Sequence, residues 1–225
     1  MSIISPDAVS SGFPCTSRPM AQRTPTKAAV HAFKKELILQ AACEAFYDKG
    51  YARATLDDIA RALDVTKPFI YYHFTSKQHL LEEICGNTSA FAADLAEQAQ
   101  ASDAEPFLDR LTHFIRCFAL RVIEERMFLA IYFRESSHLP AQTQERLRQD
   151  RKRFHLALSA LLKQGQQAGV LHIADLSITE QTLTGMVVWI FNWYKPQGPA
   201  APEALAERMV EMALAMLGVR HPDRG

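Results

Sequence analysis

The segment Thr66–Phe74 concentrates side chains that can bind nucleic acid. Ile70 and Phe74 lie four residues apart, the spacing of a helix face that packs inward. The other side chains of this short helix then face outward: Lys67, Pro68, Phe69, Tyr72 and His73. An exposed stripe of basic and aromatic side chains is costly to leave in water, so the segment indicates a binding surface.

The outward side chains match the chemistry of double-stranded DNA. Lys67 can donate to guanine or to a phosphate, and Pro68 and Phe69 can contact a thymine methyl group. Hydrogen bonds to phosphate oxygens are expected from Tyr71, Tyr72, His73 and Lys77. Two alternatives stay open, because Tyr71 is equally suited to the core and His73 to packing at the helix end.

Two short helices joined by a tight turn are expected to position this stripe. Thr55 and Asp58 form a capping-box-like start for the first helix. Thr66 caps the second helix, after a turn at residues 64–65. This is the geometry of a helix-turn-helix, whose second helix enters the major groove. Thr55 and Thr66, which begin the two helices, join the candidate DNA contacts.

The rest of the chain has helical periodicity, and no strand pattern competes with it. Expected helices cover residues 33–50, 76–100, 111–122, 128–133, 140–169, 177–194 and 202–217. The sequence therefore predicts an all-α fold. We expect a disordered basic arm (1–30), a DNA-binding head (31–80), a ligand-binding and dimerisation body (81–219) and a short tail (220–225).

Charge is uneven along the chain, although its formal net charge is zero. No acidic residue lies between Asp7 and Glu36, whereas nine basic and six acidic residues lie between Arg23 and Leu80. A basic head gains free energy from counterion release when it meets a polyanion. The arm can touch a phosphate backbone or be a mere unstructured extension, and both interpretations stay open.

Aromatic residues in the middle helices suggest an apolar cavity with a few orienting polar groups. The candidate ligand-binding residues are Phe114, Phe118, Tyr132, Phe133, Arg134, Trp189, Asn192 and Trp193. Ordinary core packing is the alternative for most of the aromatic residues. Arg121 and Arg134 suit a carboxylate or phosphate, although ion pairs with neighbouring glutamates are favoured.

The last two helices suggest a homodimer. The expected helix at 177–194 is apolar nearly all round, and the helix at 202–217 has apolar residues on two faces. A helix that is apolar on every side must be buried on every side. Two such helices from each chain would form a four-helix interface with twofold symmetry, which suits a palindromic operator. Completion of a monomer core is the weaker alternative.

The stretches Ala45–Ala60 and Val65–Leu80 resemble the head of the tetracycline-repressor (TetR) family. The resemblance covers roughly residues 33–85, and Asp64 replaces the glycine that is usual in the turn. It implies a three-helix head and a body of about six helices. It also implies a repressor that dimerises through its last two helices and leaves DNA when a small molecule fills the body.

A weaker resemblance concerns the segment Phe191–Pro199. It is similar to the corresponding break in TetR-type repressors of lipid, steroid and aromatic-acid catabolism, several of which sense acyl-CoA thioesters. This resemblance implies a small hydrophobic or acyl-CoA-like effector. The basic run at 146–153 suits a CoA phosphate, but interleaved acidic residues favour a solvated helix face.

Two other classes of protein remain as alternatives. A pure interaction protein would use the last helices to bind a different chain. An enzyme is disfavoured, because the sequence contains no glycine-rich phosphate loop, HExxH or nucleophile elbow. We therefore expect no catalytic residue, no metal ligand and no cofactor.

The compartment is expected to be the cytoplasm. The four cysteines are far apart and form no CxxC pair, which favours free thiols in a reducing cytosol. No apolar run is long enough to span a bilayer, and the N-terminus lacks the pattern of a secretory signal. We therefore expect no membrane partner.

Overall fold

The computed structural model describes residues 26–101 and 105–219, and these residues form helices and no strands. The head contains α1 (Lys27–Lys49), α2 (Leu56–Ala62) and α3 (Lys67–His73). The remaining helices are α4 (Lys77–Ala101), α5 (Phe107–Glu124), α6 (Arg126–Glu135), the 3-10 turn η1 (Ser136–His138), α7 (Ala141–Gln167), α8 (Leu176–Val188), α9 (Ile190–Trp193) and α10 (Pro202–Met216). The predicted all-α fold is confirmed.

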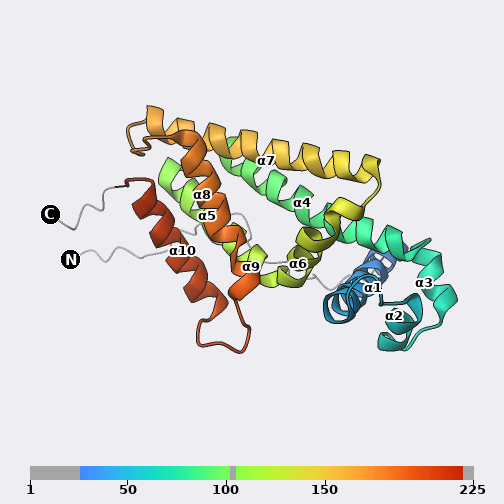
Figure 1. Ribbon diagram of the computed structural model, residues 1–225. Coiled ribbons are helices and arrows are strands. Elements are labelled where there is room, and N and C mark those ends of the chain that lie inside the picture. Colours follow the sequence, from blue (N-terminus) through green and yellow to red (C-terminus); the bar gives the residue numbers. More distant parts are fainter. Residues whose placement is uncertain (1–25, 102–104, 220–225) are drawn as a thin grey trace, which may run out of the picture.

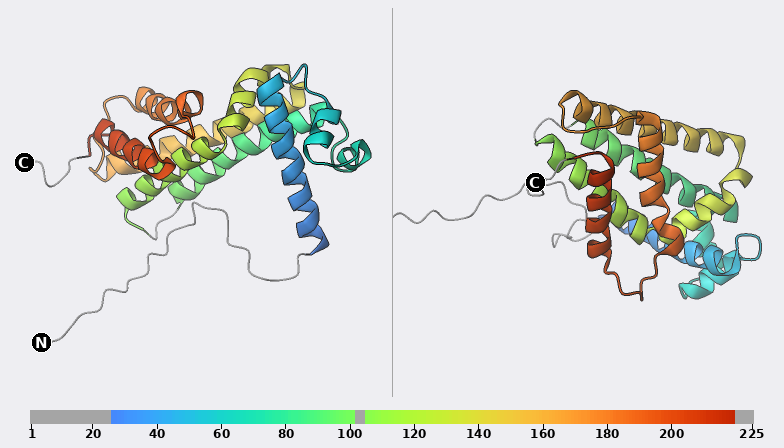
Figure 2. Two further views of the ribbon diagram at one scale, coloured as in Figure 1. Left: turned by 90° about the horizontal axis from the view of Figure 1, so that it is seen from below. Right: turned by 60° about the vertical axis from the view of Figure 1, so that its left-hand side comes forward.

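Helix α1 begins earlier than the sequence indicated. Thr26 caps it by accepting a hydrogen bond from the Ala29 N–H at 3.2 Å, so residues 27–30 are helical and their assignment to a disordered arm is wrong. The arm's residues 1–25 and the tail's residues 220–225 lie outside the described residues. Phe33 is 59% exposed, because the first turns of α1 project beyond the head core (Figure 2).

Local capping fixes the two short helices of the head. The Asp58 N–H donates to the Thr55 hydroxyl at 3.2 Å, and the Thr55 N–H donates to the Asp58 carboxylate at 3.0 Å. This completes the predicted capping box. Asp64 has φ 51°, so it adopts in the turn the left-handed conformation that glycine usually supplies. Thr66 stands at the N-cap of α3, but its side chain makes no capping hydrogen bond.

Two hydrophobic cores share helix α4. Leu80, Leu81 and Ile84 belong to the head core, which also includes residues of α6 and α7. Ala93 and Ala96, further along α4, belong to the body core. Figure 1 shows α4 and α7 running beside each other from the head to the far end of the body. One continuous helix therefore belongs to both the head and the body.

Helices α8 and α10 lie at the end of the body away from the head (Figure 1). The single helix expected at 177–194 is interrupted at Trp189, and α9 continues it for one turn. Cys43 and Cys85 are free, buried thiols, as expected, whereas Cys117 is disulfide-bonded, so the expectation of a free thiol is wrong at that position. No helix in the described part of the chain is both long and apolar enough to cross a membrane.

Candidate nucleic-acid interface and ligand cavity

Helix α3 is anchored by one face and offers the other to solvent. Ile70 and Phe74 are fully buried, as the spacing predicted. Tyr71 is 48% exposed and Tyr72 is 76% exposed, so the alternative of a core position for Tyr71 is wrong. Lys67 and Pro68 at the start of α3 are also exposed. Two large aromatic side chains and a cation therefore face outward from a fixed support.

Lys67 is held by an exposed ion pair. Its ammonium donates to the Asp57 carboxylate at 2.9 Å, and this hydrogen bond raises the pKa of Lys67. Asp57 belongs to α2, so the pair bridges the two helices of the helix-turn-helix. Exposed pairs contribute little net stability. Lys67 can therefore exchange this carboxylate for a phosphate or a guanine at small cost.

Two predicted contact residues are not free at the surface. The expectation that His73 faces outward is wrong, because only 7% of it is exposed and His31 of α1 covers it with a ring separation of 4.6 Å. Lys77 donates to the carbonyls of Tyr51 at 2.7 Å and Ala54 at 3.0 Å. Lys77 thus fastens the loop after α1 to the start of α4. Phe69 is partly buried at the edge of α3, where it packs against the head core.

The sequence did not single out the α1 residues that border α3. The His31 ring lies against His73 in a tilted arrangement, and the Lys34 ammonium lies 5.6 Å from the centre of the Phe69 ring. The signal was present in the spacing of basic residues at 27, 31, 34 and 35, which share one helix face. The expected disordered arm covered residues up to 30 and the expected helix began at residue 33, so the four basic residues were not recognised as one helix face.

The body contains an apolar cavity of about 340 Å³, a size that suits a small ligand. Phe118, Tyr132, Phe133 and Trp189 line it, as expected. The expectation that Phe114, Arg134, Asn192 and Trp193 line the same cavity is wrong. Phe114 is buried in the core behind Phe118, Arg134 lies over Tyr47, and the two α9 residues face solvent.

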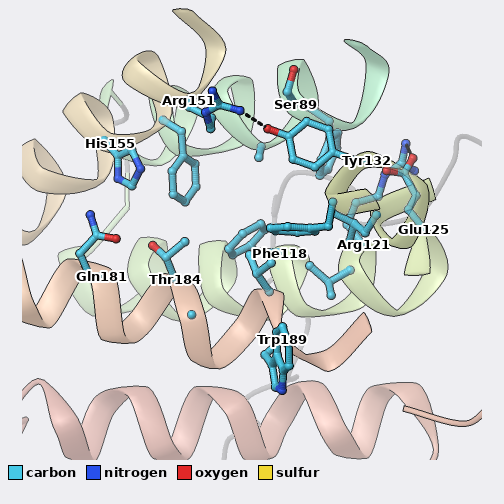
Figure 3. Close-up of a pocket in the computed structure, with 18 residues that line it drawn as sticks. Ser89, Phe118, Arg121, Glu125, Tyr132, Arg151, His155, Gln181, Thr184 and Trp189 are labelled. Carbon is cyan, nitrogen blue, oxygen red and sulfur yellow. Dashed lines mark hydrogen bonds and ion pairs between the residues drawn. The ribbon is translucent and has the colours of Figure 1, made fainter. Parts of the chain in front are cut away.

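One end of the cavity carries an arginine. Arg121 pairs with Glu124 at 3.2 Å and with Glu125, which confirms the ion-pair alternative. Its guanidinium also lies 4.5 Å from the centre of the Phe91 ring, and its buried Nε has no hydrogen-bond partner. Burial raises the pKa of Glu125, although Arg121 opposes this shift. Figure 3 shows Arg121 and Glu125 together at this end.

The opposite end carries neutral and basic groups that the sequence did not reveal. His155 lies 2.5 Å from the buried carboxylate of Glu180, which fixes its ring. The buried hydroxyl of Thr184 has no hydrogen-bond partner. Between the two ends, Arg151 donates to the hydroxyl of Tyr132 at 2.6 Å, and Tyr132 lies on the side of Arg121 and Glu125 (Figure 3). The cavity therefore presents apolar walls between two polar ends, which suits a ligand with an apolar body and a polar group.

Helix α4 also lines this cavity, with Ser89, Phe91 and Ala92. Its contacts with α7 are extensive and polar at several points. The Ser89 hydroxyl donates to Asp150 at 2.8 Å, and Arg153 donates to Glu97 at 2.6 Å. Among the described residues, no group of three or more His, Cys, Asp or Glu side chains is placed to hold a metal ion.

Known proteins are similar to this chain in sequence and in fold. YhgD of Bacillus subtilis (strain 168), an uncharacterized HTH-type transcriptional regulator, is 28% identical over 179 residues, covering 77% of this chain and 91% of YhgD. KstR2 of Mycolicibacterium smegmatis, an HTH-type transcriptional repressor, is 23% identical over 197 residues, covering 87% of this chain and 94% of KstR2.

Solved structures agree with these relatives. The TetR-family regulator PfmR of Thermus thermophilus superposes with a TM-score of 0.71 at 26% identity, covering 79% of this chain and 97% of PfmR. AibR in complex with isovaleryl coenzyme A and operator DNA superposes with a TM-score of 0.65 at 27% identity, covering 80% of this chain and 98% of AibR.

Family models match most of the described chain. Residues 38–84 match the model described as bacterial regulatory proteins, tetR family. Residues 104–217, half of the chain, match the tetracyclin repressor-like C-terminal domain. The chain therefore belongs to the tetracycline-repressor (TetR) family of DNA-binding transcriptional regulators.

Proposed function

We propose that this TetR-family protein is a repressor that binds a palindromic operator as a homodimer and leaves it when a small apolar or acyl-CoA-like effector enters the body. The observation that carries the proposal is that one helix, α4, contributes side chains both to the head core and to the lining of the cavity. A ligand that displaces α4 therefore acts directly on the head. The protein would work in the cytoplasm, where its DNA lies.

The proposed operator contacts divide into two groups. Groups at the surface or at helix starts would bind DNA directly: Thr55, Thr66, Lys67, Pro68, Phe69, Tyr71 and Tyr72. His73 and Lys77 would act mainly by holding α3 and the loop after α1, because both side chains are engaged within the head. Backbone N–H groups at the start of α4 would add phosphate contacts.

A homodimer is supported by the surface of α8 and α9. Ile178 is 66% exposed, Trp189 57% and Trp193 47%, so this surface carries several large apolar side chains. Between Ile178 and Trp189, Gly185 has open space where a side chain would be, so another helix can approach closely. Met212 of α10 is 52% exposed at the same end of the body. A second copy of this surface would cover these apolar groups.

The effector is proposed to be an apolar acid or its CoA thioester. The cavity of about 340 Å³ has room for an acyl group but not for a whole coenzyme A, so the nucleotide would remain outside. The polar end of the ligand would be oriented either by Arg121 at one end of the cavity or by His155 and Thr184 at the other. AibR, which was solved with isovaleryl coenzyme A, supports this class. Arg148 is paired with Glu145, so the basic run of α7 adds no free phosphate site there.

The proposed release mechanism is a displacement of α4. Filling the cavity would press on Phe91 and Ala92, and the polar contacts between α4 and α7 would make the two helices move together. The head of each subunit would turn with α4, and the two α3 helices would lose the spacing that matches successive turns of DNA.

Fluorescence anisotropy tests this proposal with the full chain. One duplex comes from upstream of its own gene, the other is a scrambled copy, and both are titrated over a salt series. We expect sequence-dependent binding by a dimer, which isovaleryl coenzyme A or isovaleric acid weakens. Equal binding to both duplexes that modest salt abolishes would overturn the operator proposal.

A further inference from the structure

The first turns of α1 carry a basic stripe turned towards α3. Lys27, His31, Lys34 and Lys35 lie at positions i, i+4, i+7 and i+8, so they share one face of the helix. No acidic residue lies between Thr26 and Lys35. Cations near a helix N-terminus oppose the helix dipole, so this arrangement does not serve the stability of α1.

A notch of about 400 Å³ separates this stripe from α3. It is lined by Lys27, Val30, His31, Lys34, Phe69, Tyr72 and His73. The centre of the His31 ring lies 4.6 Å from the centre of the His73 ring and 6.1 Å from the centre of the Tyr72 ring. Figure 2 shows the N-terminal part of α1 extending past the other helices beside the head. The notch thus adjoins the exposed face of the recognition helix.

The positive charge of the notch is not neutralised within the described chain. Lys27, His31, Lys34 and Lys35 have no ion pair among residues 26–101 and 105–219, whereas Lys67 on α3 is paired with Asp57. The Nδ1 atom of His73, which is 7% exposed, has no hydrogen-bond partner. Several cations and an unpartnered imidazole nitrogen around one hollow favour an anion.

We propose that this basic notch binds phosphate groups of the DNA strand that borders the groove occupied by α3, so that α1 is part of the operator interface. The proposal rests on the proposed DNA contact of α3. Lys27 and Lys34 supply the charge, and the His31–His73 pair forms the wall against which a phosphate rests. Contacts to phosphate position a protein on DNA without reading its sequence.

A matched pair of double variants tests the notch. Lys27→Gln/Lys34→Gln removes two charges from it, and Lys152→Gln/Lys163→Gln removes two exposed charges from α7. Affinity is measured over a salt series for the upstream and scrambled duplexes. We expect the notch variant to reduce the salt slope by about 1 to 2 and the affinity about tenfold on both duplexes. The α7 variant should change neither.

The result separates this inference from the proposed function. If the wild-type chain fails to distinguish the duplexes, the proposed function fails. If the wild-type chain binds specifically and both double variants behave alike, the notch is not a phosphate site. A change in sequence preference by the notch variant would also contradict a pure phosphate contact.

Duplexes with single uncharged methylphosphonate linkages supply a second test. At one or two positions beside the major groove, a methylphosphonate linkage should weaken binding of the wild-type chain. The same linkage should not change the affinity of Lys27→Gln/Lys34→Gln. Equal weakening of both proteins at every linkage would overturn the proposal. Unchanged thermal unfolding of the variants shows that the exposed lysines affect DNA binding and not the fold.

Discussion

The head of this protein carries aromatic residues on its outer surface, whereas the body carries aromatic residues along an inner cavity. In the head, Tyr72 is 76% exposed on the outer face of α3. In the body, Phe118 and Phe154 are 7% and 6% exposed and line a cavity from the inside. The head suits a large partner that arrives from outside, and the body suits a small one that enters.

The head and the body also differ in whether their basic side chains have carboxylate partners. Several arginines of the body have carboxylate partners within the chain, as Arg116 has in Glu207 at 2.5 Å and Arg153 in Asp94 at 2.7 Å. Lysines of the projecting part of α1 have no carboxylate partner among the described residues. A surface whose cations have no carboxylate partner attracts a polyanion, whereas ion pairs within the chain leave little net field.

The largest effect is expected from the exposed face of α3. Lys67→Ala combined with Tyr72→Ala should reduce operator affinity about 100-fold, because each lost base or phosphate contact costs roughly 1 to 2 kcal/mol. Fluorescence anisotropy measures the loss, and thermal unfolding should hardly change. A variant that binds the operator like the wild type would show that α3 is not the reading surface.

Tight packing in the body predicts a smaller effect on stability. A Cβ atom on Gly165 would lie 2.4 Å from Cζ of Phe107 and 2.6 Å from Cγ of Leu171. Gly165→Ala should therefore lower the free energy of unfolding by about 1 to 3 kcal/mol in denaturant titrations. Gly185→Ala meets open space in the single chain and should be harmful only if a second copy packs there. Tolerance of alanine at Gly165 would contradict this packing.

Helix capping in the head should contribute about 1 kcal/mol. Thr55→Ala removes both side-chain hydrogen bonds between Thr55 and Asp58, so we expect a loss of about that size in thermal unfolding without DNA. Thr66→Ala is the matched control, because its hydroxyl makes no capping bond in the free protein. Equal destabilisation by both changes would argue against the capping box.

The smallest effect is a pH dependence centred on His73. Burial lowers the pKa of His73, and the neighbouring cations His31, Lys34 and Lys35 of α1 lower it further. Lys27 and Tyr72 also face the notch, and no carboxylate of the described residues lines it. A lowered pKa means that His73 stabilises the fold fully above about pH 6.5 and that this contribution is lost as pH falls through the folded pKa. His73→Gln should flatten the fall in stability between about pH 7.5 and 5.5.

DNA in the notch should reverse the sign of that dependence. A phosphate favours the protonated imidazole, so operator affinity should rise as pH falls over the same interval. Comparing thermal unfolding with anisotropy on one set of buffers separates the two effects. Affinity that falls together with stability would show that no phosphate reaches His73.

The head could be predicted from sequence because its functional residues are neighbours in the chain. Thr55, Asp58 and Thr66 mark helix starts by local chemistry, and the spacing of Ile70 and Phe74 identifies the buried face of α3. The burial of His73 could not be predicted, because His31 of α1, a residue distant in the sequence, covers it.

The cavity could be predicted only in part, because several helices contribute its walls. Aromatic type identified Phe118 and Trp189, but it could not separate the lining residue Phe118 from the core residue Phe114 one helical turn away. The polar ends depend on pairs such as His155 with Glu180, which come together only when α7 packs on α8. Spacing within one helix carries no information about such pairs.

Selection from a pool of random duplexes tests the central claim most directly. The wild-type chain and Lys67→Ala/Tyr72→Ala are taken through the same rounds, and the recovered DNA is sequenced. The wild-type chain should enrich an inverted repeat whose half-sites lie about one helical turn, or a multiple of it, apart, and the variant should not. No enrichment by the wild-type chain, or the same sequence from both proteins, would contradict an operator read by α3.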